Sequence, residues 1–173
     1  MRPKVGEREP SRADIERLLD AAVRAPSHHL TQPWRFYVLT GAAKQRLANA
    51  IAAASMDSGM DAESARADGV KKVSRAPVIV VFTCAPSAEP GIVEAEEFAS
   101  VAMAIQNFLL AAHAEGLGAM LRTGPAAYHP SIREELGLAA NERVCGFVYL
   151  GYPEGRRAPT ERAAAADKTM WLA

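Results

Sequence analysis

Two short segments carry the residues of this sequence that best suit the binding of an anionic ligand. In the first, Arg24 and His28 stand on either side of Pro26, where a helical pattern ends. In the second, Arg122 and Thr123 begin the run RTGP, which is typical of a turn after a strand. Ligands are usually held on loops at the ends of regular elements. There a guanidinium offers a fork of N–H donors, and a threonine offers its hydroxyl or its backbone amide.

Each of these residues also has an ordinary structural interpretation. Arg24 alone fits a solvated charge that favours the negative end of a helix dipole, and His28 with His29 fits a surface loop. Leu121, which precedes Arg122, fits a core position. The residue types by themselves leave both interpretations open.

Other motifs that carry chemistry are missing from the sequence. No G-x-G-x-x-G follows a strand pattern, and neither a Walker lysine loop nor a G-x-S-x-G elbow occurs. The four histidines lack paired spacing and no C-x-x-C occurs, so we expect no metal site.

Composition indicates one soluble globular domain, because 49% of the 173 residues are hydrophobic and 23% are charged. Lysine plus arginine and aspartate plus glutamate each number 20, so the overall charge attracts neither nucleic acid nor an anionic membrane. The longest apolar stretch, 98–114, is interrupted by polar residues and is shorter than the roughly 20 residues that span a bilayer. Cys84 and Cys145 lie in apolar strand-like runs, which favours buried free thiols. With no apolar segment among the first residues, we expect a cytoplasmic protein.

Hydrophobic periodicity and turn residues predict helices and strands within one α+β domain. A helix is expected from Ser11, whose hydroxyl can accept from the amide of Asp14, to just before Pro26. The segment 77–83 is apolar throughout, which is typical of a strand covered on both faces. The other expected strands are 34–40, 117–121 and 143–150. The other expected helices are 41–54, 94–115 and 131–136, and Ser131 is expected to cap the last of these. The segment 55–75 is expected to be a mobile helical excursion over the surface.

The predicted helix 94–115 is apolar or small nearly all the way round its middle. Such a helix is expected to be buried on every side, which in a chain of this length indicates a central helix or a subunit interface. The polar tail from Glu154 ends in Met170, Trp171 and Leu172, and apolar residues at a terminus usually dock on another surface.

Three segments of the chain follow, in order, the pattern of a known family. In RAPSHHLTQPWRFYVL (24–39), a helix ends in A-P-S, and a match to N-x-Q-P-W and then a strand follow. AIQNFLLAAHAEGLGAMLRTG (104–124) is similar to a central helix with a G-L-G exit, and GFVYLGYP (146–153) is similar to a closing strand. This ordered set, which covers most of the chain from Ser11 to Pro153, resembles the nitroreductase superfamily, most of all its short, single-domain YdjA-like members.

The resemblance implies one nitroreductase-like α+β domain over residues 1–173. Its fold would be a central mixed β-sheet of four to five strands flanked by helices, with a long buried helix at the interface of a homodimer. The C-terminal tail 154–173 would dock on the partner subunit.

The resemblance also implies FMN bound between the two subunits, with NADH or NADPH as co-substrate. A small-molecule electron acceptor such as a nitroaromatic or a quinone would then be reduced by a ping-pong mechanism that requires no side-chain nucleophile or general base. In the similar proteins, the positions that match Arg24, His28, Leu121, Arg122 and Thr123 contact FMN. Cations and fixed donors suit this cofactor, because its phosphate is dianionic and its ring gains negative charge on reduction.

Two departures from the family pattern bear on the flavin site. The usual R-R-S-x-R segment, whose arginines grip the flavin phosphate, has no match here, although Arg2 and Lys4 stand about where its last residues would fall. Leu30 replaces the asparagine that many members carry. Losing one charge-assisted hydrogen bond costs roughly 1.5–3 kcal/mol, so we expect weaker FMN binding than is usual in the family. The alternatives are a flavin-binding or flavin-sequestering protein without turnover, and a helical scaffold that has lost the cofactor.

Overall fold

A four-stranded sheet in the order β2–β3–β5–β4 forms the centre of the computed structural model, which describes residues 4–155 and 160–172. A separate two-stranded pair joins β1 to β6. The α+β class and the strand number of the main sheet are therefore confirmed. The strands are β1 (Lys4–Val5), β2 (Trp34–Leu39), β3 (Val78–Cys84), β4 (Gly118–Arg122), β5 (Arg143–Gly151) and β6 (Pro153–Glu154).

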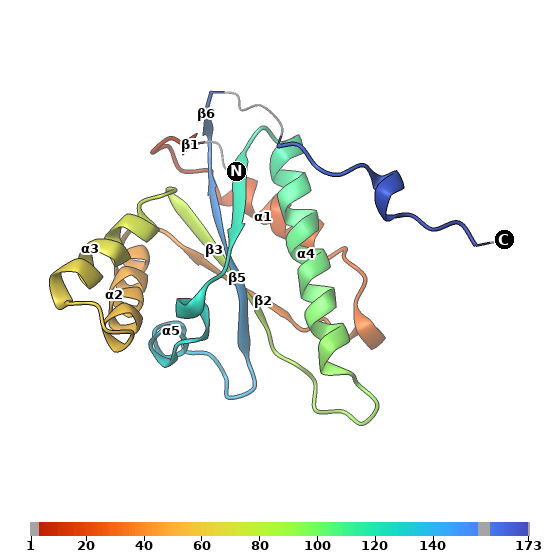
Figure 1. Cartoon of the computed structure of the whole chain (residues 1–173), viewed down its shortest axis with the longest axis horizontal. Coiled ribbons are helices and arrows are strands. Elements are labelled where there is room, and N and C mark those ends of the chain that lie inside the picture. The colour runs from red at the N-terminus through yellow and green to blue at the C-terminus, as the bar shows by residue number, and fades with distance from the viewer. Residues whose placement is uncertain (1–3, 156–159, 173) are drawn as a thin grey trace.

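Different helices cover the two faces of this sheet (Figure 1). On one face, α1 (Arg12–Ala22) and α4 (Glu94–Ala114) pack against the alternate side chains of β3 that include Phe82. On the other, α2 (Gly41–Asp57), α3 (Ala62–Val73) and α5 (Pro130–Leu136) surround the alternate set that includes Val81. All seven residues of β3 are buried, so its apolar sequence reflects two covered faces. Three short 3-10 turns complete the structure: η1 (His28–Leu30), η2 (Pro125–Tyr128) and η3 (Ala165–Lys168).

Every pairing within the main sheet is antiparallel, so the expectation of a mixed sheet is wrong. Two successive helices, α2 and α3, connect β2 to β3 and form a hairpin. The chain therefore starts β3 at the same end of the sheet where β2 finished. As a result, β3 runs against β2. The single helix α4 makes β4 parallel to β3, but β5 lies between these two strands and pairs antiparallel with both.

The segment 55–75 packs more closely than a mobile excursion would. Its main element is α3, which lies against α2 at Gly69. A Cβ atom added to Gly69 would lie only 2.2 Å from the carbonyl oxygen of Ala48, so no larger residue fits without moving one helix. The sequence did not predict this contact, because the segment is polar and the contact depends only on the small size of Gly69.

The N-cap of α5 is His129 and not Ser131, contrary to the expectation. The His129 Nδ1 accepts from the Ser131 amide at 3.3 Å, while the Ser131 hydroxyl donates to the Ala50 carbonyl oxygen at 2.7 Å. Pro130 takes the first helical position, where its fixed φ and missing N–H suit a helix start. The cap must therefore be the residue before the proline.

No helix among the described residues is both long and apolar enough to cross a bilayer.

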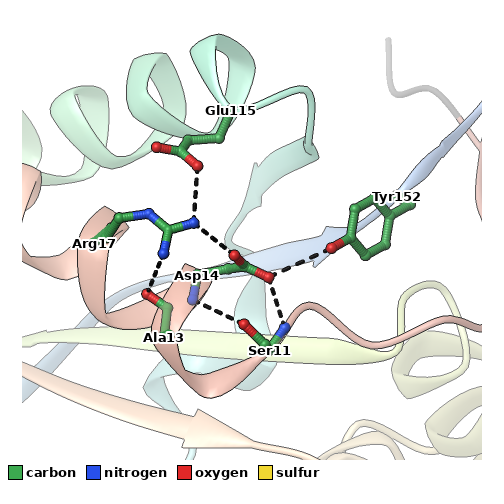
Figure 2. A network of polar contacts seen from close by, with 6 residues as sticks. All are labelled: Ser11, Ala13, Asp14, Arg17, Glu115 and Tyr152. Carbon is green, nitrogen blue, oxygen red and sulfur yellow. Dashed lines mark hydrogen bonds and ion pairs between the residues drawn. The ribbon is translucent and has the colours of Figure 1, made fainter.

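A polar network around Asp14 joins the start of α1 to two distant parts of the chain (Figure 2). As expected, Ser11 caps α1, and the Asp14 carboxylate accepts from the Ser11 amide in return. Arg17 bridges Asp14 and Glu115, at distances of 2.6 Å and 3.0 Å, and so ties α1 to the end of α4. The Tyr152 hydroxyl, just after β5, donates to Asp14 at 3.4 Å. Hydrogen bonds from Ser11, followed by the contact with Arg17, lower the pKa of Asp14 to about 2.

We predict that Asp14→Asn lowers the melting temperature at neutral pH. The folded pKa of Asp14 lies below its unfolded value of 3.8, so its stabilising effect is present above that pH and is lost as the pH falls toward 2. Thermal melts of both proteins from neutral pH down to about pH 2, a range that includes both pKa values, should therefore converge at the acid end. Asp20→Asn, on an exposed position of the same helix, is the control. Equal losses in the two variants would contradict the prediction.

Candidate functional site

A cavity of about 490 Å³ lies between α4 and the β4–β5 side of the sheet. Its apolar walls come from all three elements, with Phe98 and Ile105 on α4, Leu121 on β4 and Val144 on β5. The polar side chains that line it are Glu94, Tyr128 and Arg143, with the Cys145 thiol. An apolar cleft of this size with a few polar groups suits an organic cofactor or substrate.

Leu121 reaches this cavity from β4, an edge strand whose last residues pair with β5. Leu121 packs so tightly over Gly146 that a Cβ added there would lie 2.4 Å from its Cδ1 atom. The glycine therefore sets how deeply the Leu121 side chain can sit. Leu121 is nevertheless 37% exposed, so it is not the simple core residue that its type alone allows.

The Arg122 side chain has a buried donor without an acceptor. Its Nε atom is inaccessible to solvent and has no hydrogen-bond partner among the described residues. A buried N–H left unpaired typically costs about 1–3 kcal/mol, and an acceptor on a bound ligand would remove that cost. Thr123, the next residue, is exposed and precedes Gly124, whose φ of +133° turns the chain away from the strand.

His28 is held tightly against the N-terminal part of α4. Its Nδ1 lies 2.6 Å from the Glu96 carboxylate, and its Nε2 accepts from the Val93 amide at 3.3 Å. Its own backbone amide donates to the Ser100 hydroxyl at 3.0 Å. Both ring nitrogens are thus occupied within the chain, and the residue is no free surface histidine. Arg24, by contrast, lies exposed in the turn after α1, and its side chain makes no hydrogen bond or ion pair with the described residues.

The loop around His28 is strained, which the sequence did not reveal. Three of its residues have left-handed backbone without being glycine: His29 at φ +46°, Leu30 at +57° and Gln32 at +47°. Each such residue costs on the order of 1–3 kcal/mol, and clusters of them are typical of ligand-binding segments. The Ser27 hydroxyl accepts from the Gln32 amide at 2.9 Å and helps to hold the turn. Leu30, 79% exposed, projects from it.

The five expected site residues form two groups that do not meet within one chain. Leu121, Arg122 and Thr123 lie at the end of β4, whereas Arg24 and His28 lie beside η1. In Figure 1 the long helix α4 stands between β4 and the orange η1 turn. Within one chain the two groups therefore lie on opposite sides of α4.

α4 is not buried on every side, contrary to the expectation for the single chain. One stripe is exposed, including Met103 at 39% and Leu110 at 58%. The opposite stripe, with Val101 and Phe108, is completely buried against the sheet. The apolar surface of the helix thus includes an uncovered face that the sequence pattern alone could not separate from core. Met170, Trp171 and Leu172 are also at least 87% exposed.

Glu97 is a buried acidic residue of α4 that sequence reasoning missed. Its Oε2 atom accepts from the Ser87 amide at 2.8 Å, while its Oε1 atom has no partner among the described residues. It lies one residue from Glu96, which binds His28, so this end of α4 concentrates carboxylates beside the strained loop. In the sequence it resembled the solvated acids Glu94 and Glu96, and no signal set it apart.

Known proteins share both the sequence and the fold of this chain. The sequence pattern of the Nitroreductase family matches residues 4–152. "Putative NAD(P)H nitroreductase YdjA" from Escherichia coli (strain K12) is 31% identical over 156 residues, which cover 87% of this chain and 82% of that protein. The similarly named YfhC from Bacillus subtilis (strain 168) is 31% identical over 155 residues, covering 87% and 78% of the two chains.

Solved structures agree with the fold. A nitroreductase-like family protein from Bacillus cereus superposes with a TM-score of 0.84 at 22% identity, covering 98% of this chain and 89% of that one. NfnB, an FMN and NADPH-dependent nitroreductase derived from a sphigopyxis strain, gives 0.79 at 22% identity, with 99% and 94% covered. The family pattern extends over nearly the whole described fold, from β1 to the residue before β6, and includes both groups of expected site residues. The chain belongs to the nitroreductase family.

Proposed function

We propose that this protein is an FMN-dependent NAD(P)H oxidoreductase that reduces nitroaromatic, quinone or similar small acceptors. The observation that carries the proposal is the buried, unpaired Nε–H of Arg122 at the end of β4, where the preceding residue, Leu121, lines an apolar cavity of about 490 Å³. A flavin offers the acceptors that this donor lacks and a flat apolar ring that suits the cavity walls. The names of YdjA, YfhC and NfnB, which refer to NAD(P)H or to FMN and NADPH, support the same chemistry.

The flavin site is proposed to be shared by two subunits of a homodimer. Leu121, Arg122 and Thr123 of one subunit would face Arg24 and the His28 loop of the other, because α4 keeps these groups apart within one chain. The exposed stripe with Met103 and Leu110 would form the subunit contact, and the tail 154–173 would dock on the partner. In this arrangement the strained loop supplies its exposed backbone to the neighbouring site.

The side chains have simple roles in this proposal. Bound FMN would supply two-electron hydride chemistry between a nicotinamide and the acceptor. Arg122 would place positive charge and N–H donors against the anionic parts of the cofactor, and Thr123 would add its hydroxyl or backbone amide. Phe98, Ile105 and Leu121 would keep water from the ring. Positioning and charge are enough for catalysis of this kind, so no acid–base pair is required. We also infer that the enzyme acts in the cytoplasm.

A flavin-binding or flavin-sequestering protein without turnover is the second candidate. It is favoured by Leu30, which stands where many members of the family carry an asparagine, since a donor or acceptor near the flavin is lost there. Titration of FMN into the purified protein tests binding, and NAD(P)H oxidation in the presence of a nitro compound or quinone separates the two candidates. Binding without oxidation would select the second, and no binding would overturn both.

We predict that Arg122→Ala weakens FMN binding far more than it lowers stability. A charge-assisted contact contributes about 1.5–3 kcal/mol, so the dissociation constant should rise roughly tenfold to hundredfold. Fluorescence titration of FMN, with a thermal melt of each protein, measures both effects. Arg133→Ala is the matched control, because Arg133 is half-buried like Arg122 and binds the carbonyl oxygens of Ala139 and Ala140. Unchanged FMN affinity with a lower melting temperature would assign Arg122 a structural role only.

We further predict that the protein is a dimer at micromolar concentration and that Leu110→Arg converts it to a monomer. A charge on the exposed stripe of α4 would lie in the subunit contact, where it would lose its water without gaining a partner. Val70→Arg is the control, since Val70 is also exposed, at 46%, but on α3 across the sheet. Sedimentation velocity gives the state of each protein. A wild-type monomer, with or without FMN, would exclude the shared site.

A further inference from the structure

The two cysteines of the chain lie on neighbouring central strands. Cys84 ends β3 and is paired with Arg143 on β5. The ladder shifts between Phe82 and Thr83, whose partners are Gly146 and Val144, and this leaves Cys145 between them as a β-bulge. Cys145 is two residues from Arg143, so its side chain is on the same face of the sheet as Cys84, and both pack against the α4 cluster.

The bulge brings the two thiols together. In a regular antiparallel ladder, diagonal neighbours have Cα atoms about 7–8 Å apart, slightly too far for a disulfide. The bulge breaks this regular spacing, so the Cys145 thiol, which donates to the Arg143 carbonyl oxygen at 3.9 Å, also makes a hydrogen bond with the Cys84 thiol. That hydrogen bond and burial raise the pKa of the Cys145 thiol above its ordinary range, so the pair is held as two neutral thiols near neutral pH.

Only one of the two thiols faces the cavity. Cys145 lines the same space as Phe98 and Leu121, whereas Cys84 is completely buried behind it. A small reagent that enters the cavity therefore meets Cys145 first, and Cys84 is the only other thiol in the chain.

We propose that Cys145 and Cys84 form a reversible disulfide when a peroxide enters the cavity, and that this bond reshapes the wall on which the flavin ring rests. The thiol pair and its oxidation stand on the geometry of β3 and β5. The effect on flavin rests on the proposed function.

The chemistry requires one peroxide for each disulfide. The Cys145 thiolate attacks one peroxide oxygen, the O–O bond breaks, and Cys145 becomes a sulfenic acid while hydroxide leaves and takes up a proton as water. Cys84 then attacks the Cys145 sulfur, the S–O bond breaks, and a second water leaves. Two thiols are oxidised by two electrons in total, and the peroxide is reduced to two waters. A thiol reductant reverses the bond by exchange. Because thiolate is the reacting form, oxidation should be faster at alkaline pH.

The position of Cys145 couples this bond to the candidate flavin contact. Gly146 follows it directly and lies against Leu121, where even one added carbon would be 2.4 Å from the leucine side chain. A disulfide at Cys145 would shift the bulge and press Gly146 against the Leu121 side chain, which would then move toward its exposed side and alter the cavity wall. Flavin affinity should therefore fall when the bond forms.

The test treats the purified full-length protein with hydrogen peroxide at mildly alkaline pH. Non-reducing peptide mapping should show Cys84 linked to Cys145 within one chain, and the FMN dissociation constant should rise on the order of threefold to tenfold. Dithiothreitol should reverse both changes. In Cys84→Ala, Cys145 should stop at a sulfenic acid that dimedone traps. In Cys145→Ala, the buried Cys84 should remain unreacted, and this variant keeps the test valid if the core substitution Cys84→Ala does not fold.

Three results would overturn the proposal: two intact thiols after treatment, links between chains only, or a Cys84–Cys145 link with unchanged FMN affinity. Peptide mapping does not depend on flavin. A reduced protein that binds no FMN would therefore count against the proposed function, while the mapping result would still decide whether the disulfide forms.

Discussion

The burial of β3 and β5 on both faces is the constraint on which the rest of this structure depends. Two central strands whose side chains are apolar on both sides need helices above and below the sheet, and the chain supplies α1 and α4 on one side and α2, α3 and α5 on the other. α4 meets this need with only one stripe, since Val101 and Phe108 face the sheet while Met103 and Leu110 face outward. The same helix separates the two groups of expected site residues. The position of α4 therefore both covers the core and keeps these two groups apart.

Local signals in the sequence predicted most of the elements. The Ser11 hydroxyl and the Asp14 carboxylate mark the start of α1 because their partners lie three residues away, and the apolar run of β3 marks a strand covered on both faces. Strand direction was harder, since it depends on whether one or two helices connect successive strands, and the polarity of 55–75 hid the packed helix α3. The cap of α5 was misplaced because Pro130 displaces the capping role from Ser131 to His129.

The candidate site was predicted by residue type but not by geometry. Arg122 could be selected as a donor at the end of a strand, yet only the fold shows that its Nε is buried and unpaired. The engagement of His28 by Glu96 and Val93 brings together residues more than sixty positions apart, which no local pattern encodes. The left-handed backbone of His29, Leu30 and Gln32 had no signal at all, because glycine is the usual mark of that conformation and none is present.

The place of β5 in the sheet has a consequence for how the protein folds. β2, the α2–α3 hairpin and β3 are consecutive in the chain and contact one another, so they can assemble early from nearby residues. β5 follows β3 and β4 in the chain but must lie between them, so the sheet stays open until this strand arrives. The walls of the cavity include residues of β5, so the cavity exists only once this strand has joined the sheet. A ligand of that cavity would stabilise the folded protein and no state in which β5 is unpaired, so we expect its benefit to appear in the rate of unfolding.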